Sequence, residues 1–418
     1  MTTSSAHNAI ETVWRIEAPR LVAGLTRMVR DISLAEELAQ DALLVALRQW
    51  PDIGVPTNPG AWLMTTAKRR AIDYFRRNTM VARKLVEVAH DLETDGQAPD
   101  PAERLDDDVG DDLLNLMFVS CHPVLSREAR CALTLRLIGG LTTDEIARAF
   151  LVPEPTMAQR IVRAKKSLSE AGVKFETPLG DERHQRVGSV LEVLYLIFNE
   201  GYSATVGQDL MRPQLCEDAI RMGRILARLA PAEPEVHGLL ALMEIQASRQ
   251  FARVDARGEP ILLLDQNRGA WDRVLINRGL DGLAHAEQLG GAKGYYALQA
   301  AIAACHARAT RPEHTDWARI AALYGELAEI APSPIIELNR AVAISMAFGP
   351  QAGLDHADTL RAEPALKTYH LLATVRGDLL EKLGRKAEAG QEFERAAGLT
   401  RNERERALLR ARAAAALR

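Results

Sequence analysis

The stretch LTTDEIARAFLVPEPTMAQRIVRAKKSL, residues 141–168, decides the fold of this chain. Thr142 and Glu145 have the spacing of a capping box and predict a short helix from Glu145 to Phe150. A turn with two prolines follows over 151–155. After it comes a basic segment with helical periodicity. A capped short helix, a tight turn and a basic second helix describe a helix-turn-helix.

The segment before this motif carries a concentrated basic face. Apolar residues recur at helical spacing over 10–50 and predict two or three amphipathic helices, and the prolines and glycines of 50–60 predict a loop. Asn58 is suited to cap the next helix, which runs to about residue 77. The bases of this helix are Lys68, Arg69, Arg70, Arg76 and Arg77. A phosphate-binding face and a solvated helix surface explain them equally well.

The charge of the chain changes sharply along its length. The formal net charge is −4 over 418 residues, which argues against a chain coated for nucleic acid along its whole length. Residues 1–90 carry a net charge of +3, residues 91–112 carry −9 and residues 113–174 carry +4. Such steps usually follow domain boundaries. We therefore predict domains over 1–90, 113–174 and 175–418, with 91–112 as an acidic linker.

The C-terminal half is expected to be helical throughout, which makes the predicted fold class all-α. Prolines punctuate segments of the size of helix pairs. The residues from Leu383 to Ala396, including Phe393, match the second helix of a tetratricopeptide repeat, and Gly377 fits its first helix. One helix pair cannot bury its own apolar face, so a tetratricopeptide-like helical array is predicted.

Motifs of catalysis, cofactor binding and membrane insertion are absent from the sequence. There is no Gly-rich phosphate loop, no nucleophile elbow and no His-Glu-x-x-His. The four cysteines are predicted to be buried thiols, and the pairs Cys121-His122 and Cys305-His306 do not complete a metal site. No apolar run reaches the length of a membrane span, and no signal peptide is evident. We expect a cytoplasmic protein that is not an enzyme and holds no cofactor or metal.

Three segments in the first 80 residues, at 31–47, 58–63 and 71–77, resemble the sigma-2 domain of extracytoplasmic-function (ECF) sigma factors of bacterial RNA polymerase. The helix-turn-helix of 141–168 resembles their sigma-4 domain. The remainder resembles the C-terminal extension of one long group of these factors. The pieces that carry this last resemblance are Phe198–Tyr202, Asp265–Arg268, Tyr296–Ala304 and Glu337–Ala343.

The resemblance implies partners and site residues. Core RNA polymerase would be bound through its β′ clamp and β flap, with Glu36, Gln40 and Asp41 as polar residues of the clamp interface. The basic helix of 59–77 would lie on the −10 promoter element and the helix-turn-helix on the −35 element. The residues nearest bases would be Glu154, Thr156, Ala158, Gln159 and Arg163. Those suited to phosphates would be Arg160, Lys165 and Lys166.

Two features of the sequence bear on this reading. Pro153 and Pro155 stand where relatives commonly carry Ser and Gly, and each proline removes a backbone donor that could meet a phosphate.

A one-component transcription regulator with a helical sensor domain is the alternative, but a regulator needs one DNA-binding module and this chain has two. An enzyme in the C-terminal half is disfavoured by the missing motifs. We expect that half to regulate, through a soluble partner or by contact with the N-terminal domains.

Overall fold

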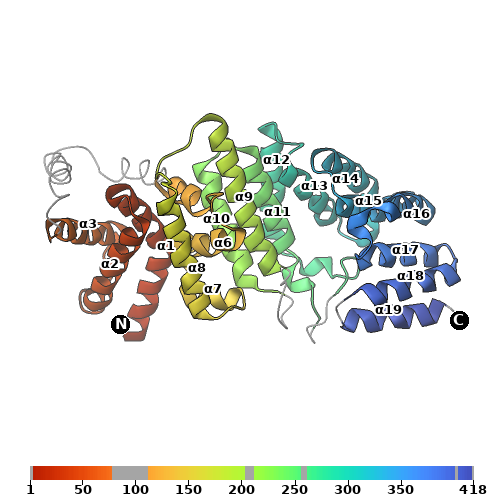
Figure 1. Cartoon of the computed structure of the whole chain (residues 1–418), viewed down its shortest axis with the longest axis horizontal. Coiled ribbons are helices and arrows are strands. Elements are labelled where there is room, and N and C mark those ends of the chain that lie inside the picture. The colour runs from red at the N-terminus through yellow and green to blue at the C-terminus, as the bar shows by residue number, and fades with distance from the viewer. Residues whose placement is uncertain (1–2, 78–111, 203–210, 256–260, 401–402, 417–418) are drawn as a thin grey trace. The chain divides into compact units, whose positions relative to one another are not determined.

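The computed structural model describes residues 3–77, 112–202, 211–255, 261–400 and 403–416. Within these ranges the regular elements are α-helices and short 3₁₀ helices, without a β-strand, which confirms the predicted all-α class (Figure 1). The chain divides into two compact units, Met1–Ala230 and Pro231–Arg418. We call them the N-terminal and the C-terminal unit.

The first three helices pack on one another as a bundle: α1 (Thr3–Val29), α2 (Ile32–Ile53) and α3 (Pro59–Arg77). The predicted cap of α3 is confirmed, because Asn58 Oδ1 accepts a hydrogen bond of 3.0 Å from the backbone N–H of Ala61. The side chain of Asp31 caps α2 in the same way, at Leu34. Trp50, fully buried, holds α2 against α3 through an edge-to-face contact with Trp62.

The predicted loop over 50–60 is shorter than expected. Helix α2 continues through Pro51 to Ile53, and the chain leaves the helix at Gly54, whose φ is +82°. Pro51 fits in the last turn because its φ is already helical and the backbone N–H that closes the turn comes from Gly54, which bonds to the carbonyl of Trp50. Proline therefore marks the end of this helix without starting the loop.

The helix-turn-helix predicted over 141–168 is present, within a segment over 112–174 that we call the helix-turn-helix domain. It contains a helix over 112–120, then α6 (Arg127–Leu137), α7 (Thr143–Ala149) and α8 (Glu154–Glu170) (Figure 1). The capping box at α7 is present in both directions. Glu145 N–H donates to Thr142 Oγ1 at 3.2 Å, and Thr142 N–H donates to Glu145 Oε2 at 2.7 Å.

Two further helices, α9 (Gly180–Tyr202) and α10 (Pro213–Leu229), belong to the same compact unit as the helix-turn-helix domain. The boundary predicted near residue 175 therefore does not coincide with the division of the structure, which falls after Ala230. The guanidinium of Arg130, in α6, donates 2.9 Å hydrogen bonds to Ser189 and Glu192 of α9. Arg221 of α10 donates to the carbonyl of Gly139 at 2.6 Å. These polar contacts attach α9 and α10 to the helix-turn-helix domain.

The end of α9 lies in the Phe198–Tyr202 segment. Gly201 lies inside the last turn of α9 and does not cap the helix. A Cβ at this position would meet the backbone nitrogen of Cys216 at 2.8 Å and the carbonyl oxygen of Arg212 at 2.9 Å. Glycine is required here because the start of α10 lies directly against this turn.

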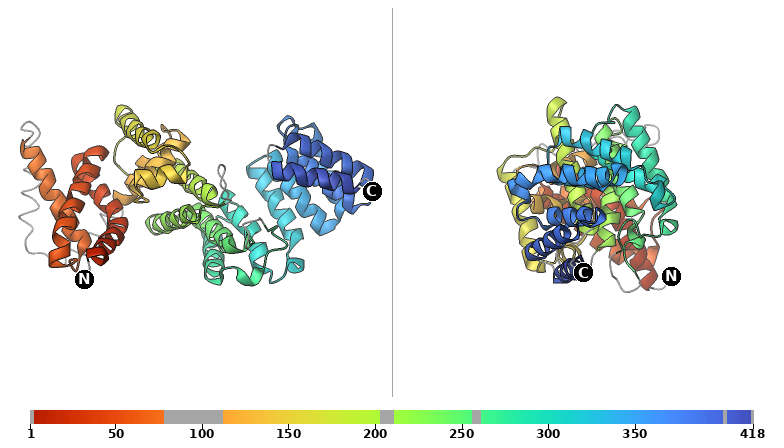
Figure 2. Two further views of the ribbon diagram at one scale, coloured as in Figure 1. Left: turned by 90° about the horizontal axis from the view of Figure 1, so that it is seen from below. Right: turned by 90° about the vertical axis from the view of Figure 1, so that its right-hand side faces the viewer.

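The C-terminal unit is a series of helices in which successive helices pack on one another (Figure 2). Short 3₁₀ turns join some of them, among them η1 (Gln250–Ala252), η2 (Arg268–Ala270), η3 (Pro312–His314), η4 (Leu360–Ala362) and η5 (Pro364–Leu366). The helices are α11 (Pro234–Ala247), α12 (Arg273–Gln288), α13 (Tyr295–Arg308), α14 (Trp317–Ile330), α15 (Pro334–Phe348), α16 (Pro350–Thr359), α17 (His370–Lys382), α18 (Lys386–Leu399) and α19 (Glu403–Ala416). Packing between neighbours in sequence is the organisation of a helical repeat array.

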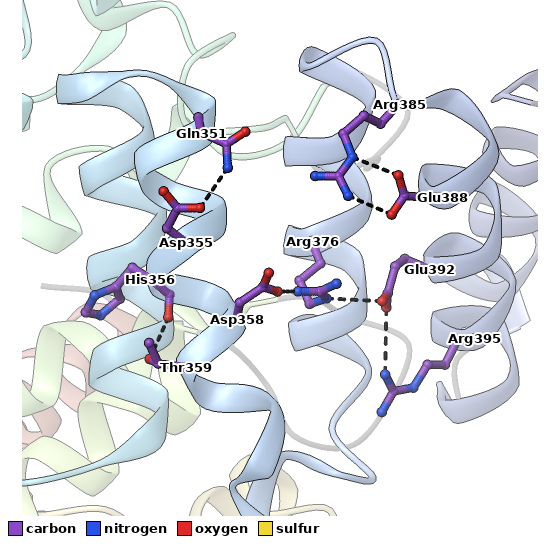
Figure 3. Close-up of polar contacts among 10 residues, drawn as sticks. All are labelled: Gln351, Asp355, His356, Asp358, Thr359, Arg376, Arg385, Glu388, Glu392 and Arg395. Carbon is purple, nitrogen blue, oxygen red and sulfur yellow. Dashed lines mark hydrogen bonds and ion pairs between the residues drawn. The ribbon is translucent and has the colours of Figure 1, made fainter.

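The predicted repeat motif lies at the α17–α18 hairpin, but its second helix begins later than predicted, because Leu383 caps α17 and Gly384 lies in the turn with a φ of +74°. Gly377 of α17 has no room for a side chain, because a Cβ there would come within 2.5 Å of the ring of Phe393 in α18. Arg376, the residue before it, is buried and pairs with Asp358 at the end of α16 and with Glu392 of α18, the latter at 3.1 Å (Figure 3). One arginine thus links three successive helices.

Candidate nucleic-acid interface

Helix α8 has one buried and one exposed face. Met157, Ile161, Ala164 and Leu168 are buried at helical spacing and pack the helix into its domain. Gln159, Val162, Arg163 and Lys166 are exposed on the opposite side. Spacings of three and four residues place them on one stripe of the helix. This stripe, which we call the outer face of α8, carries an amide, two cations and an apolar side chain.

The other residues predicted to contact DNA lie beside this face. Glu154 and Thr156 are exposed in the first turn of α8, whereas Ala158, Arg160 and Lys165 are half-buried. Pro153 precedes the helix and Pro155 lies in its first turn. The backbone N–H groups of Thr156 and Met157 both donate to the carbonyl of Pro153. The start of α8 therefore offers few backbone donors to a phosphate, as the prolines suggested.

Val162 is a residue that the sequence analysis did not select. Its side chain is 64% exposed, between Gln159 and Arg163 on the outer face of α8. The signal that could have found it is the helical register: the buried residues of this helix recur at 157, 161, 164 and 168, and 162 is out of phase with them. An apolar side chain among residues that are predicted to read bases is suited to contact the methyl group of thymine.

Only part of the basic face of α3 is exposed to solvent. Arg69, Arg70 and Arg76 are exposed, and the side chain of Arg77 lies outside the described residues. Lys68 is half-buried, and burial together with the nearby charge of Arg27 lowers the pKa of its ammonium group. Three of the five predicted phosphate contacts thus stand on an open helix surface.

The predicted polymerase-binding residues of α2 differ in their surroundings. Asp41 is half-buried and Gln40 is exposed, with its amide donating to Glu36 Oε1 at 3.2 Å. Glu36 is only 9% exposed. Its carboxylate accepts a 2.7 Å hydrogen bond from Arg136 Nε and a second hydrogen bond from Lys165 Nζ. Glu36 therefore lies in a contact between the α1–α3 bundle and the helix-turn-helix domain.

The pKa of Glu36 reflects this contact. Burial by itself raises the pKa of a carboxyl, but the charges and hydrogen bonds of Lys165 and Arg136 outweigh it and hold the pKa below its usual value. A groove of about 320 Å³ adjoins Glu36. The bundle lines it with Trp14, Val22, Leu43 and Leu44 among others, and the helix-turn-helix domain with Leu137 and Leu141 among others.

The cysteines are buried, as predicted. The thiol of Cys121 lies 3.2 Å from Thr134 Oγ1, and burial raises its pKa to about 11. In the described part of the chain, no three His, Cys, Asp or Glu side chains converge as metal ligands would. None of the helices that the structure describes combines the length and apolarity needed to cross a lipid bilayer.

Comparison with known families matches three segments of the chain. Sigma-70 region 2 covers residues 14–80, Sigma-70 region 4 covers residues 116–168, and a family of unknown function (DUF6596) covers residues 186–287. The first match contains α2 and α3, and the second contains the helix-turn-helix. The fold and these matches define a sigma factor, which has core RNA polymerase and promoter DNA as its partners.

The chain is also similar to whole proteins, among them two that are named as sigma factors. "Uncharacterized protein R00370" of Rhizobium meliloti (strain 1021) is 44% identical over 394 residues, 94% of this chain and 92% of that protein. "Probable ECF RNA polymerase sigma factor SigI" of Mycobacterium tuberculosis (strain H37Rv) is 28% identical over 171 residues, 40% of this chain and 57% of that protein. "Ferric citrate uptake sigma factor FecI" of Escherichia coli (strain K12) is 29% identical over 162 residues, 39% and 90% respectively. No solved structure matches. The chain belongs to the sigma-70 family and is an ECF-type sigma factor with an additional C-terminal domain.

Proposed function

We propose that this sigma factor places α3 on the −10 element and α8 on the −35 element of its promoters, in the cytoplasm, by binding alone and without catalysis. The observation that carries the proposal is the outer face of α8, where Gln159, Arg163 and Lys166 are exposed opposite the buried face of the same helix. An amide or guanidinium group can make two hydrogen bonds to the edge of one base, whereas the ammonium group of lysine acts as a point charge on phosphate. Gln159 and Arg163 are therefore proposed to read sequence and Lys166 to position the helix.

The proposed polymerase contacts lie on both the α1–α3 bundle and the helix-turn-helix domain. The polar face of α2 with Glu36, Gln40 and Asp41 is proposed to bind the β′ clamp, and the helix-turn-helix domain is proposed to bind the β flap. The match to region 2 in addition to region 4 supports this over a one-component regulator, because a regulator has no need of a polymerase-binding bundle. Charge reversal in Asp41→Arg should weaken the complex with core polymerase and leave the bundle folded, since Asp41 is not part of the core.

We propose further that the C-terminal unit modulates transcription through a soluble protein partner. Its stacked helices form a compact unit of their own. Arrays of this kind present extended surfaces that suit protein recognition, and no catalytic motif occupies this part of the sequence. A compact helical array without a catalytic motif is therefore proposed to act through protein contacts, as a regulatory domain.

The test is run-off transcription with purified core polymerase, comparing the full chain with a chain that ends at Ala230. This truncation keeps α9 and α10 on the helix-turn-helix domain, because the compact N-terminal unit ends there. The full chain should give promoter-specific transcripts, and truncation should change their yield severalfold. Absence of transcripts from the full chain would contradict the sigma function, and equal yields would contradict modulation by the C-terminal unit.

A further inference from the structure

The end of α7 has a carbonyl group that the helix itself cannot satisfy. In a continuing α-helix the carbonyl oxygen of Ala149 would accept from the N–H four residues later, but that residue is Pro153, which has no N–H. Leu151, inside the turn, has a φ of +50°, in the left-handed region that favours glycine. The turn that sets the direction of α8 therefore lacks one backbone hydrogen bond and contains a strained residue.

Arg212, the residue that precedes α10, supplies the missing donor. Its Nη1 donates to the carbonyl oxygen of Ala149 and to Glu200 Oε1 in α9. Its side chain is 14% exposed, so these hydrogen bonds are largely shielded from solvent. The backbone N–H of Arg212 donates to the carbonyl of Gly201 at 2.7 Å, which attaches this arginine to the end of α9. The helix dipole of α7 also favours a cation at its carbonyl end.

Arg221, further along α10, makes a second contact of the same kind. Its Nη2 donates to the carbonyl oxygen of Gly139, just after α6, at 2.6 Å and to Asp218 Oδ1 at 3.0 Å. Asp218 is buried. In both contacts one terminal nitrogen of an arginine joins a carboxylate of α9 or α10 to a carbonyl oxygen at the end of α7 or α6. We call these two contacts, through Arg212 and Arg221, the α10 bridges.

We propose that Arg212 and Arg221 are positioning residues for promoter reading, because the α10 bridges hold α6 and α7 in the arrangement that presents the outer face of α8 to DNA. Side chains that read bases must be held to within about 0.5 Å, and hydrogen bonds of the surrounding residues provide this. The family of unknown function that matches residues 186–287 includes α10 and most of α9. The first part of that segment thus belongs to the DNA-reading module. This inference rests on the proposed reading of the −35 element by α8.

Four variants of the full chain test the α10 bridges. Arg212→Met keeps part of the aliphatic stem and removes both hydrogen bonds of Nη1, and Arg221→Met does the same at the second bridge. Arg212→Lys keeps a terminal nitrogen that can donate to both oxygens. The matched control is Arg228→Met, at an exposed arginine in the last turn of α10. Circular dichroism checks that each variant is folded.

The measurement is run-off transcription with core polymerase from one promoter and from a panel of its single-base −35 variants. Wild type should prefer the native −35 sequence by about tenfold over a change at a base that α8 reads. Arg212→Met and Arg221→Met should lower this preference to about twofold, while the yield from the weakest promoter changes little. Arg212→Lys and Arg228→Met should keep the preference of wild type.

The outcomes separate positioning from folding. Equal preference in wild type and in both methionine variants would overturn the proposal. A loss of yield by the same factor on every −35 sequence would also overturn it, because the bridges would then only stabilise the fold. A lysine variant as impaired as Arg212→Met would contradict the assignment to the hydrogen bonds of Nη1. Absence of promoter-specific transcripts from wild type would contradict the proposed function itself, and this inference with it.

Discussion

Glu192 and Arg130 join α9 to the helix-turn-helix domain, and their loss should have unequal effects. Arg130 has a side chain that is 10% exposed, whereas that of Glu192 is 34% exposed and also bonds Arg127 at 2.9 Å. In Glu192→Ala the buried guanidinium keeps, among the residues that the structure describes, only Ser189 as a side-chain partner. An uncompensated buried charge costs about 3–5 kcal/mol, and water reaching the exposed edge of the site reduces this to about 2 kcal/mol.

Arg130→Met should cost less than about 1 kcal/mol. Methionine fills much of the volume of the arginine stem, Glu192 retains Arg127 and water, and the hydroxyl of Ser189 still donates to the carbonyl of Cys121. Removing one partner of a buried pair is costly when the charge left behind is buried and uncompensated, but Glu192 is 34% exposed and keeps its pair with Arg127. Native-state hydrogen exchange of α6 and α9 in the full chain measures both opening free energies. A larger loss in Arg130→Met than in Glu192→Ala would refute the reasoning.

Three further predictions concern DNA reading and pH. Gln159→Ala should change which −35 sequence is used, by about 1–3 kcal/mol at one base pair, whereas Lys166→Ala should weaken all promoters alike; a panel of single-base promoter variants distinguishes the two. If Val162 contacts a thymine methyl, replacing that thymine by deoxyuridine should weaken wild type about fourfold, as expected for about 0.8 kcal/mol per buried carbon, and should not affect Val162→Ala. Burial, with the charges of Arg249 and Arg268, lowers the pKa of His306 to about 4. The unfolded chain therefore binds the proton first as the pH falls below about 6.5, and the C-terminal unit should lose about 2 kcal/mol by pH 5 that His306→Gln does not lose, as measured by urea unfolding at each pH.

The elements that the sequence predicted best are those fixed by local chemistry. The capping box of Thr142 and Glu145 and the cap at Asn58 involve residues three apart, so their geometry follows once the helix forms. The all-α class followed from periodicity, and the Gly377 pattern correctly located a helix hairpin. The acidic linker of 91–112 stays a prediction for 91–111, which lie outside the described residues. Asp112, its last residue, is buried and paired with Arg27.

The domain boundary near residue 175 stays a prediction, because local signals do not decide it. Gly172 and Gly180 both have positive φ angles, so the chain does turn near residue 175 as the glycines indicated. A turn does not decide which domain the next helix joins. That depends on side chains such as Ser189 and Arg221, which bond groups 68 and 82 residues away in the sequence. Pairings at this separation leave no periodic signal.

Glu36 shows the same limit at the candidate site. The sequence places a carboxylate on a helix whose resemblance implies a polymerase interface, and the structure places that carboxylate in a contact inside the chain, against Arg136 and Lys165. Its role in binding polymerase stays a prediction. A buried carboxylate requires cationic partners, but its chemistry does not determine whether those partners belong to the same chain or to polymerase. Lys165 and Lys166 are neighbouring bases with the same chemistry but different surroundings. One step of helical rotation turns Lys165 toward Glu36 and leaves Lys166 exposed on the outer face of α8. Residue type alone therefore does not predict which of the two lysines is available to DNA.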